Sequence, residues 1–494
     1  MKTYIAIIVA AISLALSNES PSAHPTIAVT AQDPGPSPFI SFVHLTISGP
    51  VALSYVTFQI HPKFGSATRA LSATYSAGYL RRRGYLDPRT GRVTVPVFGL
   101  YPGYNNTVKL VSHFVDGTSQ ADTVMIQTPV FDGGTYSNPT IIQSLLPGTT
   151  LSYDYILLKN YATPNTPIII DSDAQVRWVG TANIGSMNCA LFDNALYVAF
   201  GTQLFRIEFD GQFQILADYS ALGVTGFHHN IDYGKSGLII DVDTNAWTES
   251  VDIEVDAAGN VLKTWNLADI ISVAMIAGGD DPTKFVHPAP IDWFHNNATA
   301  YRPSDNSLIV SSRENFVISI DYDSGAIKWI LGDPTKHWHQ FQSLRNFALT
   351  LGPFTLPPIG QHAVSLTKTV SLGGDQLLLF DDGTNSQYQM PPGENRDYSA
   401  PRSYSIDQQR RVATETWHYL ANPPIYSPFC SSVYEDLPKN YLIDYTLGGP
   451  YIFTEIVGLD ATGEKAFDYM YNEQDFCGTA FYAVPIHLEN LDFK

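Results

Sequence analysis

Short apolar runs alternate with turn residues along most of the chain. Between about residues 38 and 128 the runs show period two, as in Ser41–Ile47 and Thr107–Ser112. Such alternation is typical of strands that bury one face and expose the other. Because Gly and Pro turns separate these runs, we predict a β-sandwich of immunoglobulin-like size over residues 28–135. A Gly-, Pro- and Ser-rich connection from Asp132 to Thr149 follows it.

From about residue 150 onward one unit recurs. It is a hairpin in which an apolar residue and Asp precede a turn, usually with Gly, and an apolar strand closes in an aromatic residue. The instances lie at residues 209–211, 255–265, 320–329, 406–417 and 459–467. Each hairpin follows a shorter apolar strand; these strands are Leu196–Phe200, Leu238–Val242, Leu308–Ser312, Leu377–Phe380 and Tyr441–Asp444.

These units predict a six-bladed β-propeller over residues 150–494. Five units are complete, and residues 176–178 and 480–484 supply a sixth that the two ends of the region share. A β-helix or a repeated sandwich would need more even periods. The expected fold is therefore all-β, with an N-terminal immunoglobulin-like β-sandwich followed by a six-bladed β-propeller.

Three histidines stand at matching places in successive units. His228, His295 and His362 each lie shortly before the short apolar strand of their unit. Repeats arranged around an axis bring equivalent positions together, so we expect these side chains to face one cavity. Imidazole titrates near neutral pH and can serve as nucleophile, base or acid. We therefore predict an active site at the axis, with these histidines as catalytic residues.

Further candidates flank the histidines. Arg313 follows the next strand of the His295 unit, and we predict a catalytic role because guanidinium matches an anion of spread charge. His229, Asn297 and Ser431 occupy channel positions and are predicted to contact substrate. Strand alternation should turn the side chain of His229 away from that of His228. We expect no cofactor and no metal, because no carboxylate or cysteine stands at ligand spacing to the histidines of residues 337–339.

Charge narrows the range of partners. Charged residues make up 15% of the 494 residues, and the formal net charge is −19. Phosphate binding needs basic surface, so we exclude nucleic acid and anionic membranes as partners. A small aromatic substrate is the expected partner, and the sequence leaves the oligomeric state open.

The N-terminus predicts entry into the secretory pathway. Lys2 and the apolar run from Ile5 to Leu16 have the layout of a signal peptide, which we assign to residues 1–20. The run is too short to span a bilayer, and no later stretch qualifies as a transmembrane helix. Asn105 begins the sequon Asn105-Asn106-Thr107, and we predict that it is glycosylated. Asn297 begins a second sequon, but a glycan there would block the predicted site.

The chain has three cysteines. An oxidising compartment permits one disulfide, and we predict Cys430–Cys477 because the two lie about one blade apart. Cys189 is then left over. We expect it to be buried in the core, with a place on the cavity wall as the alternative.

Three motifs resemble the arylsulfotransferase family. Residues 292–297 with 311–313 resemble its first signature, residues 360–362 with 379–383 its second, and residues 98–110 its N-terminal domain. The family has a six-bladed propeller, in agreement with the repeats. The resemblance implies that His362 takes a sulfuryl group from an aryl sulfate and passes it to a phenol. It also implies that His228, His295, Asn297 and Arg313 hold the sulfate oxygens and protonate the leaving phenol.

One departure favours another chemistry. Where the family commonly has His-His-Asp, this chain has His228-His229-Asn230, so the orienting carboxylate is missing. The chain is also similar to the family's fungal secreted branch, which includes hetero-Diels–Alderases of tropolone sesquiterpenoid biosynthesis. This resemblance implies cyclisation of a phenolic or tropolone-like quinone methide with a terpene alkene of the humulene type. Aromatic residues in the inserted loops, Trp338, Phe341, Phe354 and Tyr398, are available as apolar walls for it.

Three functions thus remain open. The cyclisation is the first hypothesis, and a PAPS-independent aryl sulfotransferase acting through a sulfohistidine is the alternative. The third is a secreted propeller that binds a partner without catalysis. This third hypothesis predicts that substitutions at His295 or His362 leave function untouched.

Overall fold

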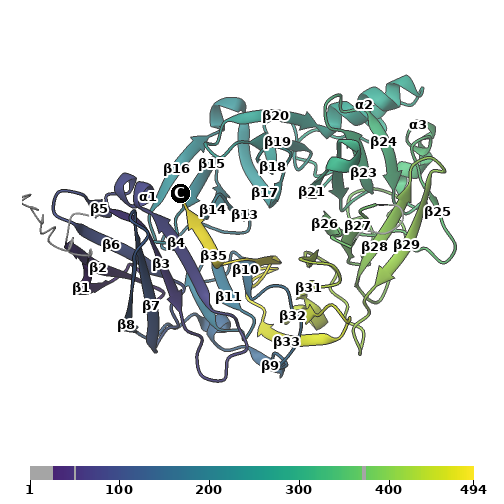
Figure 1. Cartoon of the computed structure of the whole chain (residues 1–494). Helices are drawn as coiled ribbons and strands as arrows, with labels where there is room; N and C mark the ends of the chain where they lie inside the picture. Colours follow the sequence, from purple (N-terminus) through teal and green to yellow (C-terminus); the bar gives the residue numbers. More distant parts are fainter. Residues whose placement is uncertain (1–25, 49–51, 370–373) are drawn as a thin grey trace, which may run out of the picture.

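The computed structural model describes residues 26–48, 52–369 and 374–494. The predicted signal peptide, residues 1–20, lies outside the described residues. Two sheets form the N-terminal β-sandwich (Figure 1). The first has the order β1-β2-β6-β5, with β1 Thr26–Pro34, β2 Ile40–Ser48, β5 Leu86–Asp87 and β6 Arg92–Phe98. The second has the order β35-β4-β3-β7-β8, with β3 Leu53–Ile60, β4 Leu71–Ser76, β7 Asn105–Phe114, β8 Ser119–Gln127 and β35 Glu489–Phe493.

Strict alternation builds this sandwich. Every second residue of β7 is buried, from Asn106 to Phe114, while the residues between them are less buried. The inward side chains meet those of the facing sheet in one apolar core. The predicted period-two strands are therefore confirmed, and the immunoglobulin-like sandwich with them.

Six further sheets stand around an axis as propeller blades (Figure 1). From the innermost strand outward, the first three are β34 Tyr482–Ile486, β10 Tyr155–Lys159, β11 Ile168–Asp171 and β12 Val176–Val179; β13 Cys189–Phe192, β14 Ala195–Phe200, β15 Gln203–Ile207 and β16 Phe213–Asp218; and β17 Val224–Tyr233, β18 Leu238–Thr244, β19 Val251–Val255 and β20 Val261–Asn266.

The other three blades are built in the same way. They are β21 Asn296–Arg302, β22 Ser307–Ser312, β23 Val317–Asp321 and β24 Ile327–Leu331; β26 His362–Leu366, β27 Leu377–Asp381, β28 Ala400–Asp407, β29 Val412–His418 and β25 Thr350–Leu351; and β30 Ser432–Glu435, β31 Tyr441–Leu447, β32 Phe453–Leu459, β33 Lys465–Asn472 and β9 Thr140–Gln143. The α-helices are α1 Ala77–Arg82, α2 Leu267–Ala277, α3 Gln342–Arg345 and α4 Gly448–Tyr451. Among the described residues, no helix is long and apolar enough to cross a membrane.

The predicted hairpins and short apolar strands are confirmed in each of the five blades that they predicted. Each predicted hairpin joins the third and fourth strands from the axis, and each predicted short apolar strand is the second strand from the axis. The blade shared by both ends is also present. β34 pairs antiparallel with β10, with Val484 opposite Leu157, and so closes the ring.

The chain ends cross the predicted domain division. β35 leaves the propeller and pairs parallel with β4, so that Phe493 lies opposite Tyr75 in the sandwich. β9, which precedes residue 150, adds an outer strand to the last blade by pairing with β33. A strand near each end of the propeller thus crosses the predicted boundary: β35 pairs with the sandwich, and β9, which follows the sandwich in the chain, pairs with the last blade. Each strand completes a sheet edge that would otherwise be unpaired.

The sandwich is fixed to the propeller by a shared core. The ring of Phe98 stacks on that of Phe209, with centroids 4.6 Å apart. The buried guanidinium of Arg177 donates to the carbonyl of Gly99 at 2.7 Å and 3.0 Å and pairs with Asp171 at 2.9 Å. Apolar packing and a satisfied buried charge hold the two domains in one orientation.

Replacing Phe98 by alanine should destabilise the protein by about 3–5 kcal/mol, because it leaves a cavity at this shared core. Phe64, which is fully exposed in the same domain, supplies the control variant Phe64→Ala. Chemical denaturation followed by fluorescence measures both. Equal free energies of unfolding for the two variants would contradict a core that joins the domains.

Candidate active site

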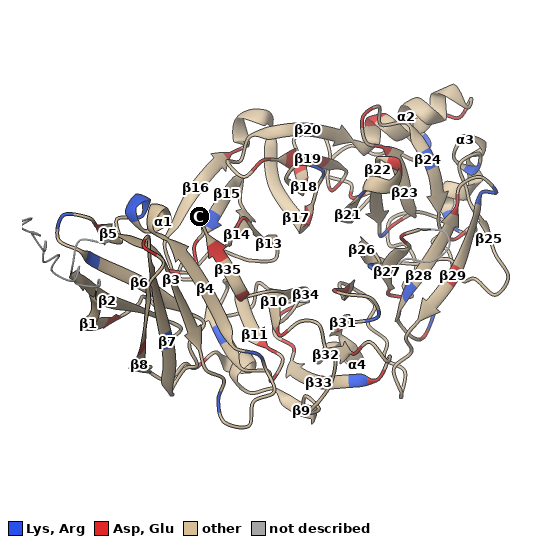
Figure 2. Ribbon diagram, viewed as in Figure 1, with Lys and Arg blue, Asp and Glu red and all other residues tan. Residues whose placement is uncertain are grey.

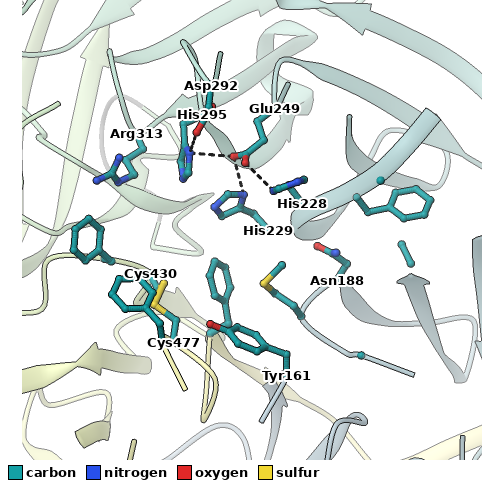
Figure 3. A pocket seen from close by; sticks show the side chains of 18 of the residues that line it. Tyr161, Asn188, His228, His229, Glu249, Asp292, His295, Arg313, Cys430 and Cys477 are labelled. Atoms are coloured by element: carbon teal, nitrogen blue, oxygen red, sulfur yellow. Dashed lines mark hydrogen bonds and ion pairs between the residues drawn. A yellow bond between two sulfur atoms is a disulfide. The ribbon is translucent and has the colours of Figure 1, made fainter. Parts of the chain in front are cut away.

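A cavity of about 660 Å³ opens at one mouth of the propeller channel (Figure 3). Loops and inner strands of all six blades line it. One side is polar and charged, with His228, His229, Glu249, Asp292, His295, Arg313 and His362. The other side is largely apolar, with Tyr161, Met187, Phe200, Phe227, Phe429, Phe476, Phe481 and the Cys430–Cys477 pair. Three histidines that the sequence placed at equivalent blade positions therefore meet in one cavity.

A break in the inner strands aims these side chains. The pairing of β17 with β18 shifts between Phe227 and Ile231, and His229 has a left-handed φ of 53°. Alternation therefore fails at this point, and His228 and His229 both line the cavity. The prediction that His229 turns away from His228 is wrong, because a β-bulge re-aims its side chain.

The same irregularity recurs in the next two blades. His295 has a φ of 55° just before β21, and Ala363 has a φ of 52° directly after His362. The register of β26 against β27 shifts between His362 and Ser365. Left-handed backbone at residues other than glycine carries strain, which the surrounding packing must hold. Such residues gather at functional sites, in agreement with the placement of the three histidines.

Glu249 joins three histidines on the charged side. Its carboxylate lies 2.7 Å from Nδ1 of His228, 3.2 Å from Nδ1 of His229 and 3.1 Å from Nδ1 of His295. It comes from the loop between β18 and β19, and further acidic residues lie on these two strands (Figure 2). The sequence analysis missed it, because its loop varies in length between blades and no motif marks the position.

Asp243 and Asp292 complete this charged side. Asp243 lies 2.7 Å from Nε2 of His228, so both nitrogens of that ring face a carboxylate. Asp292 contacts Nδ1 of His295. Burial disfavours the charged form, yet the Asp243 and Glu249 carboxylates outweigh it and raise the pKa of His228 to about 11. Burial also lowers the pKa of His295, but the carboxylates of Glu249 and Asp292 outweigh burial and raise this pKa.

The remaining two histidines are neutral. Burial lowers the pKa of His229, and the positive charges of His295 and His228 lower it further. Burial and the charges of His295 and Arg313 lower the pKa of His362. At neutral pH His228 is thus an imidazolium, the pKa shift of His295 favours its protonated form, and His229 and His362 are neutral.

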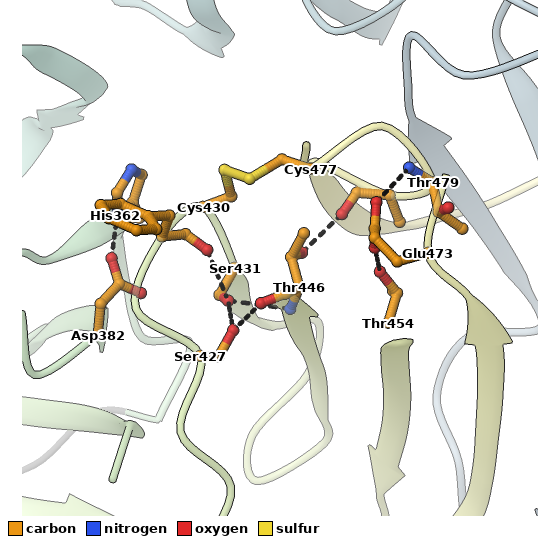
Figure 4. Close-up of a disulfide and its surroundings, with 12 residues drawn as sticks. His362, Asp382, Ser427, Cys430, Ser431, Thr446, Thr454, Glu473, Cys477 and Thr479 are labelled. Carbon is orange, nitrogen blue, oxygen red and sulfur yellow. Dashed lines mark hydrogen bonds and ion pairs between the residues drawn. A yellow bond between two sulfur atoms is a disulfide. The ribbon is translucent and has the colours of Figure 1, made fainter. Parts of the chain in front are cut away.

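The tautomer of His362 follows from its neighbours. Its Nδ1 lies 3.0 Å from the carbonyl oxygen of Gly360 and also contacts the carboxyl group of Asp382 (Figure 4). A carbonyl can only accept, so Nδ1 carries the proton and Nε2 keeps a free electron pair. Burial raises the pKa of Asp382, which favours its neutral form. The result is a fixed neutral imidazole with a nucleophilic nitrogen.

Arg313 is a buried cation with spare donors. Its Nη1 pairs with Glu314, and its guanidinium carbon lies 4.9 Å from the centre of the Phe429 ring. Within the described part of the chain, its Nη2 has no hydrogen-bond partner. Arg313 lines the cavity, so its guanidinium adds a positive charge to the cavity wall, and its Nη2 is a buried donor without a partner among the described residues.

Asn297 and Ser431 lie outside the cavity lining. The amide of Asn297 donates to the carbonyl of Gln361 at 2.8 Å and is fully buried, so it joins neighbouring blades. The hydroxyl of Ser431 is used by Ser427, at 2.8 Å, and by the amide N–H of Thr446, at 3.0 Å (Figure 4). The predicted substrate contact of Ser431 is thus corrected, because its hydroxyl is already occupied inside the last blade.

Asn230 also lies away from the cavity lining. Its amide oxygen accepts from the buried ammonium of Lys159, and its amide nitrogen donates to Asp232 at 2.6 Å. The carboxylates that orient His228 come instead from Asp243 and Glu249. The argument that this chain lacks an orienting carboxylate is therefore wrong.

Both cysteine predictions are confirmed. Cys430 and Cys477 form a disulfide that lines the cavity (Figure 3). Cys189 is free and buried, and burial raises the pKa of its thiol to about 12.

The four inserted-loop aromatics expected as walls do not line the cavity in the described structure: Trp338 and Phe341 pack in a core cluster, Phe354 is fully exposed, and the Tyr398 hydroxyl accepts from Arg402. Tyr388, another aromatic residue of an inserted loop, lines the cavity. Asn105 is exposed, and its glycosylation stays a prediction.

Fold and site together define an axial-cavity β-propeller with an immunoglobulin-like N-terminal domain. The chain belongs to the arylsulfotransferase (ASST) family, whose pattern matches residues 142–472. The arylsulfotransferase Ig-like domain matches residues 45–129. The resemblance at family level is confirmed, and the placement in the fungal hetero-Diels–Alderase branch stays a prediction.

Two curated relatives are bacterial. The chain is 26% identical over 271 residues to the arylsulfate sulfotransferase AssT of Escherichia coli O6:H1, covering 50% of this chain and 43% of the relative. It is 24% identical over 284 residues to AssT of Lelliottia amnigena, covering 46% of each chain. The chain therefore spans less than half the length of these relatives. Among solved structures, Saccharomyces cerevisiae Sqt1 gives a TM-score of 0.33 at 10% identity, covering 75% of this chain and 83% of that one.

Replacing Glu249 by glutamine should lower the pKa of His228, because one of its two carboxylates loses its charge. A folded-state pKa of about 11, against an ordinary 6.5, stabilises the fold fully below pH 6.5, and this contribution is lost as the pH rises toward 11. Glu249→Gln should therefore narrow the pH range, above 6.5, over which the stabilising contribution of His228 is lost. Histidine titration by NMR measures the change.

A surface pair supplies the control for this titration. Asp436 and Glu489 raise the pKa of the half-exposed His487 to about 10. Asp436→Asn should lower the pKa of His487 and leave that of His228 in place. An unchanged His228 titration in the Glu249→Gln protein would show that this carboxylate does not hold the imidazolium.

Proposed function

We propose that the protein transfers a sulfuryl group from an aryl sulfate to a phenol, with His362 as the nucleophile. The observation that carries this proposal is the arrangement around His362. Gly360 and Asp382 hold its protonated Nδ1, and Nε2 is left free in a cavity that also contains Arg313 and the imidazolium of His295. The family, and the fact that both relatives are arylsulfate sulfotransferases, support the same reaction.

The steps follow from the protonation states. Nε2 of His362 attacks sulfur, so that an N–S bond forms while the S–O bond to the phenol breaks. The leaving phenolate takes a proton from the His295 imidazolium. The acceptor phenol then attacks sulfur, the N–S bond breaks, and the acceptor's proton returns to His295. The chain ends the cycle unchanged.

The other charged groups have electrostatic roles. The free amino group of Arg313 binds a sulfuryl oxygen and stabilises charge as the bond to the leaving group breaks. Both nitrogens of His228 are occupied by carboxylates, so His228 contributes fixed positive charge rather than a proton. His229, neutral and 4.5 Å from the ring of His295, is placed to contact the aryl group.

A second candidate is the hetero-Diels–Alder cyclisation of a quinone methide with a humulene-type alkene. One observation favours it: the side of the cavity opposite the histidines is largely apolar, with aromatic rings from several blades. Such a wall suits a terpene and can fix one approach of two apolar reactants. The Asn230 departure no longer supports this candidate, because His228 has its own carboxylates.

Replacing His362 by alanine should abolish nitrophenolate release from 4-nitrophenyl sulfate in the presence of a phenol acceptor, by at least about a thousandfold. His339→Ala, a histidine in a loop outside the cavity lining, should retain wild-type release. Mass spectrometry of the protein trapped without acceptor should find the sulfuryl group on His362. Release that persists in the His362→Ala protein would refute the proposed nucleophile.

The cyclisation has its own variant. Phe481 lies 5.4 Å from the ring of His229, and Phe481→Ala should slow cycloadduct formation from humulene and a quinone methide precursor about tenfold or more. The exposed Phe64→Ala protein is the control. Cycloadduct without nitrophenolate release would replace the sulfuryl-transfer proposal. If the folded wild-type protein and its histidine variants are all inactive in both assays, the third hypothesis, a propeller that binds a partner without catalysis, is favoured.

A further inference from the structure

Three histidines share an arrangement that sulfuryl transfer does not require. Nδ1 of His229, His295 and His362 faces the carboxyl groups of Glu249, Asp292 and Asp382 respectively. One nitrogen of each ring lies within 4.8 Å of the others. Since a carboxyl group lies close to each Nδ1, the nitrogen left to bind a ligand in each ring is Nε2. No contact within the described ranges uses these three Nε2 atoms.

Carboxylate, imidazole and metal in series is a recurring design of metal sites. A histidine that binds a metal through one nitrogen almost always donates the other N–H to a carboxylate or carbonyl, which fixes its tautomer and orientation. Here His295 and His362 contact Asp292 and Asp382 in this way, and Nδ1 of His229 lies 3.2 Å from Glu249 without a hydrogen bond. The three rings come from three blades. A bulge or left-handed residue in each blade delivers the ring to the cavity.

We propose that this cluster binds a divalent transition-metal ion, Zn²⁺ by ligand class, through Nε2 of His229, His295 and His362, with the fourth position open to the cavity. Three imidazoles suit zinc, cobalt or copper and not calcium or magnesium, which take oxygen ligands. The proposal does not depend on sulfuryl transfer, because it rests on the arrangement of the rings alone.

The geometry requires only a small adjustment. Nitrogen ligands of a tetrahedral zinc ion lie about 3.4 Å apart, so the three rings must close by about an ångström. The centroids of His229 and His295 are already 4.5 Å apart, and that of His362 lies 6.1 Å and 6.4 Å from them. Side-chain rotation in an open cavity can supply this movement.

Charge in the neighbourhood favours a cation on balance. Glu249 and Asp292 stand behind two of the ligands, and Asp243 lies behind His228, whereas burial raises the pKa of Asp382 and favours its neutral form. Arg313 and the His228 imidazolium, on the same cavity wall, oppose a further positive charge, although Glu314 pairs with Arg313 and two carboxylates, Asp243 and Glu249, pair with His228. The carboxylates that favour a protonated imidazole here also favour a metal ion in its place.

A bound ion would change the chemistry of the cavity. It would occupy Nε2 of His362, the nitrogen that attacks sulfur in the proposed transfer. Metal and aryl sulfate therefore exclude each other, and the ion inhibits transfer competitively. The open fourth position would hold a water molecule, whose pKa zinc lowers toward neutrality.

Titration of the metal-stripped full-length protein with Co²⁺ tests the site without any enzymatic activity. We expect one equivalent to bind with the visible absorption of a tetrahedral ion, and Zn²⁺ to displace it. His229→Ala, His295→Ala and His362→Ala should each weaken binding tenfold or more. Asp382→Asn should weaken it about 10–100-fold. His418→Ala, a surface histidine 2.7 Å from Glu415, should bind as wild type.

Several outcomes would overturn the proposal. No spectral change in the folded wild-type protein, or a spectrum that survives His229→Ala and His362→Ala, would place no metal at this cluster. If these variants fail to fold, X-ray absorption of the zinc-loaded wild-type protein counts the imidazole nitrogens bound to the ion. Three imidazole nitrogens support the site, and fewer than three refute it.

The two proposals fail separately. Tetrahedral Co²⁺ binding in a protein that never releases nitrophenolate would leave the metal site standing and remove sulfuryl transfer. His362-dependent transfer in a protein that binds no Co²⁺ would do the reverse. If both hold, Zn²⁺ should raise the KM for the aryl sulfate and leave kcat unchanged.

Discussion

Closure of the ring by β34 and β10 is the constraint on which the rest of this structure depends. β34 comes from the end of the propeller and β10 from its beginning, yet they pair as the two inner strands of one blade. Without this pairing the blades would form an open array, and their inner strands would not face one axis. The cavity exists because the ring is closed. The parallel pairing of β35 with β4 then fixes the closed ring to the sandwich.

Irregular backbone turns this regular frame into a site. A perfect inner strand would direct alternate side chains away from the cavity, so His228 and His229 could not both reach it. Bulges and left-handed residues at His229, His295 and Ala363 break the alternation in three successive blades. These conformations cost energy, and the dense blade packing around them supplies it. Some of the strained backbone of the described residues thus lies where the histidines converge.

The charge pattern gives chemically equal side chains different states. Two carboxylates hold His228 as an imidazolium, while burial among positive charges keeps His362 neutral. Such a division of roles is what acid–base and nucleophilic chemistry need at one pH. The same carboxyl groups orient three rings toward one point, so group transfer and metal binding compete for a single set of nitrogens. The apolar side of the cavity is compatible with either type of aromatic substrate.

The sequence by itself determined the architecture and most of the candidate site, because both follow from repetition. Period-two runs predicted the sandwich strands, the recurring hairpins predicted five blades, and residues 176–178 with 480–484 predicted the blade shared by both ends. Equivalent positions in stacked repeats must lie together, which brought His228, His295 and His362 into one cavity and Arg313 beside them. Cys430 and Cys477 were likewise paired by their spacing of about one blade.

Only the tertiary structure decided the features that break the repeat. The bulge at His229, the carboxylate of Glu249 from a loop of irregular length, and the inward hydroxyl of Ser431 have no periodic signal in the sequence. Asn230 was misjudged for the same reason, since its contact with Lys159 joins strands far apart in the chain. Local pattern specifies which residues recur, whereas long-range packing decides where each side chain points and which charge it meets.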